Sequence, residues 1–290
     1  MAIDLVPKVS RRPVLDRLLR DRRAHLATPL LFLLLLAAAL APFMSDAAAT
    51  TDTGRILAGP SSAHLLGTDE IGRDVLVRIV AGAWVTVGVA TITVGAALVL
   101  GTVLGLVAGY RGGWVDSFVM RVSDGLLAFP LLVLALTVVA ALGPGLRNAL
   151  IAIAVVTTPR FARVVRGEVL SLRTREWVSA ARIVGVSRMA IMRRHLLPHL
   201  AGTLLVFAAL QVSTAIMAEA ALSFLGLSVQ PPQPSWGAIV ASGTDHLNAS
   251  WSLSVFPGLA ILLTVAAFNL LADALRDALD SHRPELAPSR

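Results

Sequence analysis

Long apolar segments alternate with short polar ones along this 290-residue chain. About 20 apolar residues suffice for a helix to cross the hydrocarbon core of a bilayer. We expect six such segments, at about 26–44, 79–110, 118–142, 146–165, 200–225 and 255–275. The pattern therefore predicts an all-α, polytopic membrane protein with six transmembrane helices.

The polar segments set the remaining boundaries. Residues 1–25 form a basic tail, 26–280 a transmembrane domain with outer loops at 45–78 and 226–254, and 281–290 a short polar tail. The basic start, the apolar run and three alanines at 47–49 also resemble a cleaved signal peptide. We favour an uncleaved span, because the apolar run is longer than a signal core.

Basic residues predict the orientation. If both termini are cytoplasmic, 21 of the 25 lysines and arginines fall in inner segments and four in outer segments. By the positive-inside rule, both ends and the arginine-rich segment 168–199 lie in the cytoplasm. The basic surplus borders apolar spans, so it indicates membrane topology rather than nucleic-acid binding.

Two features stand out within the spans. Gly101, Gly105 and Gly109 lie four residues apart, a spacing that permits close contact between helices in lipid. Pro130 predicts a kink in the third span. At the inner end of the fourth span, Arg160, Arg163 and Arg166 lie at three-residue spacing and predict that the helix continues into the cytoplasm.

The composition excludes most chemistry. The chain has no cysteine, so a thiolate nucleophile, a thiolate metal site and a disulfide are all absent. The one lysine, Lys8, follows no glycine-rich turn, so the chain lacks its own P-loop for ATP. The histidines have no metal-ligand spacing with a second donor. We therefore expect no catalytic residues, metal or cofactor.

A polar segment between the fourth and fifth spans, residues 176–198, has its own pattern. Trp177, Ala180, Ala181 and Val184 predict a short helix that ends at Gly185. Ser187 is suited to cap a second helix with Met189, Met192 and Leu196 on one face, and Pro198 to open the next helix. This helix–glycine–helix bracket is either a rigid knob that transmits force or an amphipathic loop on the lipid surface.

Glu219 is the one clearly intramembrane carboxylate. Ionisable residues at this depth are costly and often functional. Glu219 either lines a translocation path or accepts a hydrogen bond from a neighbouring helix, and the sequence leaves both alternatives open.

Several stretches resemble one family. Glu176-Trp177-Val178-Ser179-Ala180-Ala181, Gly185, Ile191 and Leu197-Pro198 resemble the cytoplasmic EAA loop of ABC-importer permeases. Residues 64–83, 221–240 and 256–280 resemble the C-type permease of the dipeptide/oligopeptide/nickel branch. Ser179 stands where the loop usually has a second glutamate, which puts an ion pair at that position in doubt.

The resemblance implies a type I ABC-importer permease fold in a bacterial inner membrane. It implies a half-pore paired with a homologous B-type permease, two ATPase subunits that bind the ATP, and an extracytoplasmic substrate-binding protein. We expect the ATPase-coupling residues to be Glu176, Trp177, Ala180, Ala181, Arg182, Gly185, Ile191, Arg194, His195 and Pro198. The possible translocation residue is Glu219.

Two further functions compete with a peptide importer subunit. A self-sufficient secondary transporter or channel would also lack a P-loop, but it would need more buried ionisable groups. A structural scaffold would leave Glu219 and the glycine-lined span without a purpose. The cargo itself stays open between dipeptides, longer peptides, nickel chelates, glutathione and haem.

Overall fold

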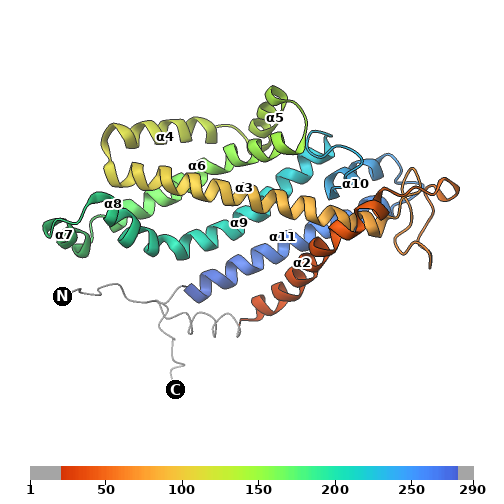
Figure 1. Cartoon of the computed structure of the whole chain (residues 1–290), viewed down its shortest axis with the longest axis horizontal. Helices are drawn as coiled ribbons and strands as arrows, with labels where there is room; N and C mark the ends of the chain where they lie inside the picture. The colour runs from red at the N-terminus through yellow and green to blue at the C-terminus, as the bar shows by residue number, and fades with distance from the viewer. Residues whose placement is uncertain (1–20, 280–290) are drawn as a thin grey trace, which may run out of the picture.

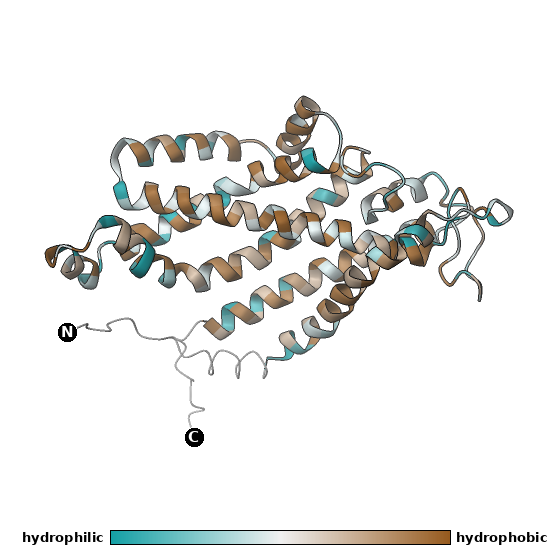
Figure 2. Cartoon of the chain, viewed as in Figure 1, coloured by the Kyte–Doolittle hydropathy of each residue, from teal (hydrophilic) through white to brown (hydrophobic). Residues whose placement is uncertain are grey.

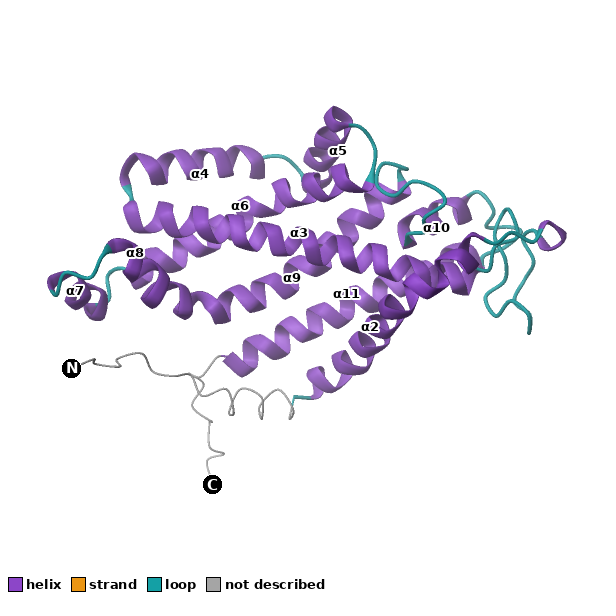
Figure 3. Ribbon diagram, viewed as in Figure 1, coloured by secondary structure: helices purple, strands orange, loops and turns teal. Residues whose placement is uncertain are grey.

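The computed structural model describes residues 21–279, which form helices joined by short turns (Figures 1 and 3). No strand occurs in this range, only one isolated bridge between Thr68 and Asp74. The long helices are α2 (Arg22–Ala49), α3 (Val75–Arg111), α4 (Gly113–Leu127), α5 (Leu131–Leu142), α6 (Leu146–Leu172), α9 (Leu197–Phe224) and α11 (Ser252–Leu279). The expectations for residues 1–20 and 280–290 of the two tails lie outside the described residues.

Five of these helices are long and apolar enough to cross a membrane, and the bent pair α4–α5 makes a sixth candidate. The third span is not one kinked helix, as the sequence suggested, but two helices at 94° to each other. Pro130 cannot donate a backbone hydrogen bond, and it disfavours helical backbone at the residue before it. Pro130 itself has an extended backbone and occupies the position immediately before α5.

The helices run side by side and their connections gather at two ends (Figure 1). The bracket helices α7 (Glu176–Ile183) and α8 (Arg188–Ala190) lie at one end, and α10 (Trp236–Thr244) and the 50–74 loop at the other. Apolar residues dominate the long helices (Figure 2). An ion pair of 3.0 Å between Arg23 and Asp277 joins the start of α2 to the end of α11. The cytoplasmic assignment of the bracket end stays a prediction.

The three glycines of α3 form its contact with α6. A Cβ at Gly105 would lie 2.5 Å from the carbonyl oxygen of Ala162 and 2.7 Å from Cβ of Val165. Gly101 and Gly109 meet α6 one turn to either side in the same way. The close helix–helix contact predicted from the four-residue spacing is therefore present, and its partner is α6.

The connection between α9 and α11 contains structure that the sequence did not predict. Residues 226–254 are not only a loop, because Ser235 caps the helix α10 with its side chain. Trp236 is buried, and its Nε1 donates a 2.8 Å hydrogen bond to the Ile79 carbonyl. It packs beside Gly82, where a Cβ would stand 3.2 Å from the indole ring.

We predict that Gly105→Ala destabilises the protein by about 1–3 kcal/mol, because overpacking forces α3 and α6 apart. Gly95→Ala is the matched control, since no atom lies within 4 Å of a Cβ there. The measurement is the thermal midpoint of the purified protein in detergent. Equal midpoints for the two variants would show that the seam does not depend on close approach.

Candidate functional site

The bracket, residues 176–198, begins with a helix that ends in a glycine turn. In α7, Val178 faces inward and is fully buried. Gly185 has φ of +83°, its N–H donates to the Arg182 carbonyl, and the N–H of Val186 donates to the Ala181 carbonyl, both at 3.0 Å. This pair of bonds closes the helix end in a left-handed turn, where glycine is the favoured residue. The turn predicted at Gly185 is present.

The second helix begins as predicted, with the Ser187 side chain accepting a hydrogen bond from the Ala190 N–H. It then widens into a π-helical segment at Ile191–Leu196 and continues into α9. Pro198 therefore does not open a separate helix, but lies in the first turn of α9. Ile191 and Leu196, five residues apart, are both fully buried, as the wider π turn allows.

The π segment also alters which side chains face outward. Met189, predicted to share an inner face with Met192 and Leu196, is exposed instead. Ile183 and Val184 beside it have exposed fractions of 86% and 82%. We call these three apolar side chains the bracket tip; they belong to α7, α8 and the turn between them, which lie at one end of the molecule in Figure 1.

Aromatic and cationic contacts hold the bracket to the helix ends. The Trp177 ring stacks on His199, with centroids 4.9 Å apart and planes at 17°, and His195 lies 6.2 Å away. The Arg182 guanidinium lies 5.2 Å above the Tyr110 ring at the end of α3. The bracket is therefore a fixed projection of α6, α9 and α3.

The structure brings the ten predicted coupling residues together in one bracket but gives them different surroundings. Ile191 is buried, and Trp177, Ala181 and His195 are half-buried. The exposed members are Glu176, Ala180, Arg182, Gly185, Arg194 and Pro198. Sequence reasoning missed His199 as the stacking partner of Trp177; the four-residue spacing from His195 was the available signal.

Glu219 is enclosed near the other end of α9. Its side chain is fully buried, and Oε1 accepts hydrogen bonds from the hydroxyls of Ser223 at 2.6 Å and Ser228 at 3.5 Å. Oε2 has no hydrogen-bond partner among the described residues. In this state the carboxyl group links α9 to the following turn. A role of Glu219 in the translocation path stays a prediction.

A buried ionic cluster organises the outer loop before α3. Asp69 is fully buried; its Oδ1 accepts from the backbone N–H groups of Arg73 (2.8 Å) and Ile71 (3.0 Å), and its Oδ2 contacts the guanidinium groups of Arg73 and Arg78. Burial alone would raise the pKa of Asp69. These backbone hydrogen bonds and the charge of Arg78 outweigh burial, so the pKa lies below its ordinary value.

No group of three histidine, cysteine, aspartate or glutamate side chains within residues 21–279 is placed to hold a metal ion. The described chain instead combines a bundle of apolar helices with a rigid bracket between its fourth and fifth spans.

The chain belongs to the family of binding-protein-dependent transport system inner membrane components, whose profile matches residues 101–283. It is therefore a multi-pass permease of the bacterial inner membrane, and not an enzyme. Such permeases work with ATPase subunits and a substrate-binding protein.

Similar proteins support this assignment. The chain is 42% identical to the dipeptide transport system permease protein DppC of Alkalihalophilus pseudofirmus, over 93% of this chain and 89% of the relative. It is 43% identical to the glutathione transport system permease protein GsiD of Pectobacterium atrosepticum, over 90% and 88%. The fold matches a chain of the inward-facing MetNI methionine ABC transporter with a TM-score of 0.59 and 18% identity, covering 70% of this chain and 97% of that one.

We predict that Asp69→Asn costs about 3–5 kcal/mol of stability, because buried Arg78 loses its counter-charge and Arg73 keeps only its ion pair with Glu70. Since the folded pKa of Asp69 is lowered, its contribution is complete at neutral pH and is lost as the pH falls below about 4. Thermal midpoints measured from pH 7 to pH 3 should therefore converge at the acid end. Asp245→Asn, at an exposed position on the same side, is the control; an equal loss there would contradict a specific role of the cluster.

Proposed function

We propose that this chain is the C-type permease subunit of an ATP-driven importer of peptides. Its bracket docks on a cytoplasmic ATPase subunit and transmits the movement of that subunit to the membrane helices. The observation that carries the proposal is the bracket tip, where Ile183, Val184 and Met189 are exposed on a projection fixed by buried Val178, Ile191 and Leu196. Exposed apolar side chains on a rigid support are typical of a protein–protein contact.

The bracket joins two membrane helices, α6 and α9, and is suited to transmit force to both. On one side it follows α6 after a turn of three residues, and on the other it continues into α9 without a break. Both helices pack along α3. A displacement of the bracket tip therefore moves two spans together, which is what alternating access requires of a coupling element.

The partners follow from the same proposal. One chain supplies half of the conduit, and a homologous B-type permease supplies the other half. Two ATPase subunits bind and hydrolyse the ATP, since this chain has no lysine in a P-loop. A substrate-binding protein delivers the cargo from outside. The relatives named for dipeptide and glutathione transport support a peptide cargo.

The function is tested by reconstituting the full transporter with its binding protein in liposomes and measuring ATP-driven uptake of a radiolabelled dipeptide. We expect uptake that requires ATP, the binding protein and both permeases. Uptake by this chain alone, without ATP, would instead identify a secondary transporter or channel.

Gly185→Val is expected to abolish ATP-driven uptake while the protein still inserts and purifies. A β-branched residue resists the positive φ of the turn, whereas no neighbouring atom limits a side chain at this position. Gly185→Asn is the matched control, because asparagine tolerates left-handed backbone. Normal uptake by the valine variant, or equal loss in both, would argue against the turn as the critical feature.

Ala180→Trp is expected to weaken attachment of the ATPase subunits, because an exposed bulky ring would separate the bracket from its partner. Ala180 is exposed, so the substitution leaves the packing of the chain itself intact. The measurement is the yield of ATPase that co-purifies with tagged permease. Ala63→Trp, in the outer loop, is the control. Unchanged yield for Ala180→Trp would contradict docking at this face.

A further inference from the structure

The helix α4 leaves two chemically different stripes exposed. One stripe is apolar and consists of Trp114, Phe118 and Val122. The other is polar and includes Ser117, Arg121 and Asp124. Because residues of a helix advance by about 100° each, the two stripes lie roughly a quarter turn apart. One exposed side of α4 is thus suited to lipid and the adjacent side to water.

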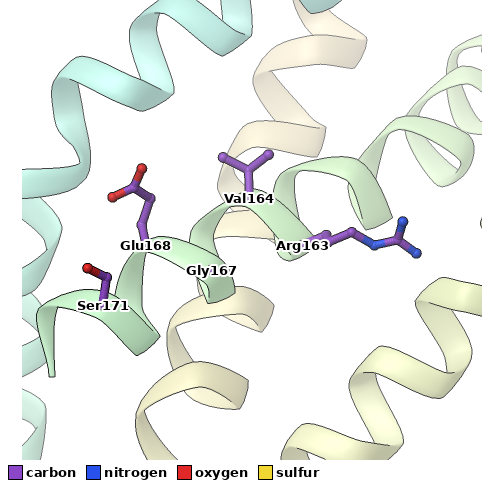
Figure 4. A pocket seen from close by; sticks show the side chains of 5 residues that line it. All are labelled: Arg163, Val164, Gly167, Glu168 and Ser171. Atoms are coloured by element: carbon purple, nitrogen blue, oxygen red, sulfur yellow. The ribbon is translucent and has the colours of Figure 1, made fainter. Parts of the chain in front are cut away.

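The polar stripe continues onto α6. Arg163 of α6 donates a 2.6 Å hydrogen bond to Asp124, and Arg166 pairs with Asp116 at 2.6 and 2.7 Å. Beyond Arg163, a groove of about 470 Å³ runs along α6 (Figure 4). It is lined by Arg163, Val164, Gly167, Glu168 and Ser171. We call the exposed residues Ser117, Arg121, Asp124, Arg163, Gly167 and Ser171 the α4/α6 polar face.

The depth of this face follows from the packing of α3. A Cβ at Gly105 would meet the Ala162 carbonyl and the Val165 side chain, so Arg163, between these two residues, lies close to the level of Gly105. Gly105 is inside the charge-free run of α3 from residue 79 to 110, six residues before its end at Arg111. At 1.5 Å per residue, that is about 9 Å from the end of the helix.

Charges at this depth need water or a partner. The side chains of Arg163 and Asp124 remain 53% and 61% exposed, so the bundle of this chain does not cover them. Ionisable residues inside a membrane face the bundle interior or a water-filled cavity, because exposure to lipid is costly. The apolar stripe is the side of α4 that is suited to face lipid, so the polar face is left to contact water.

We propose that the α4/α6 polar face is the wall of the water-filled conduit in its bracket-side half. The proposal rests on the function proposed above and names the surface along which the cargo passes. The face carries the Arg163 guanidinium and the Asp124 carboxylate, and the groove beside it is also lined by Glu168 (Figure 4). A wall with both signs of charge suits a zwitterionic peptide, because it offers weak partners to each end without holding either tightly.

Cysteine accessibility tests the assignment directly, since the chain contains no cysteine. Single cysteines replace Ser117, Gly167 and Ser171 on the polar face, and Phe118 and Val122 on the apolar stripe. The complete transporter, without nucleotide, is treated in inside-out membrane vesicles with a cationic, membrane-impermeant methanethiosulfonate. The unsubstituted transporter gives the background from its partner subunits.

We expect the three polar-face cysteines to react at least about tenfold faster than the two apolar-stripe cysteines, because the reactive thiolate forms only in contact with water. Modification should also block ATP-driven dipeptide uptake for the polar-face variants alone. Equal rates at both stripes would overturn the assignment. So would polar-face cysteines that react in the purified single chain but not in the transporter, since a partner permease would then cover this face.

The uptake assay separates the two proposals. If an unmodified cysteine variant shows no ATP-driven uptake under conditions where the unsubstituted transporter does, that substitution has damaged the protein, and the remaining polar-face cysteines test the assignment. If the unsubstituted transporter itself shows none, the proposed function fails. The labelling rates still report whether the polar face contacts water.

Discussion

The close contact between α3 and α6 at Gly101, Gly105 and Gly109 is the interaction on which the rest of the structure depends. Between helices in lipid there is no hydrophobic driving force, so association relies on van der Waals contact and close backbone approach. A Cβ at Gly101 or Gly105 would overlap backbone atoms of α6, and a Cβ at Gly109 would lie 2.9 Å from Cβ of Val169. The seam fixes α6 alongside α3 in the bracket-side half of the bundle.

Consequences of this seam reach both candidate functional surfaces. The contact with α3 supports α6 as one unbroken helix up to Leu172, and the bracket begins after the short turn that follows. It also places Arg163 and Arg166 opposite the aspartates of α4. The same helix therefore supports the bracket at its end and the α4/α6 polar face along its side, and a movement of the bracket reaches that face through a rigid element.

Much of this arrangement was predictable from the sequence, and the exceptions have identifiable reasons. Apolar run lengths and glycine spacing determine the spans, the seam and the turn at Gly185. The 94° break was not predictable, because a proline such as Pro130 is compatible with a kink or a complete break. The prediction that Met189 faces inward was wrong, because the π-helical segment departs from the 3.6-residue period of an α-helix.

Two sets of side chains are in surroundings that a single chain cannot satisfy. Ile183, Val184 and Met189 are exposed on the bracket tip, where burying each would contribute about 1.5–3 kcal/mol. Asp124 and Arg163 are exposed on the α4/α6 polar face, where contact with lipid would be unfavourable for their charge. The first set is suited to an apolar protein surface and the second to water. The proposed assembly meets both requirements, because a partner covers the tip and a second permease encloses the conduit.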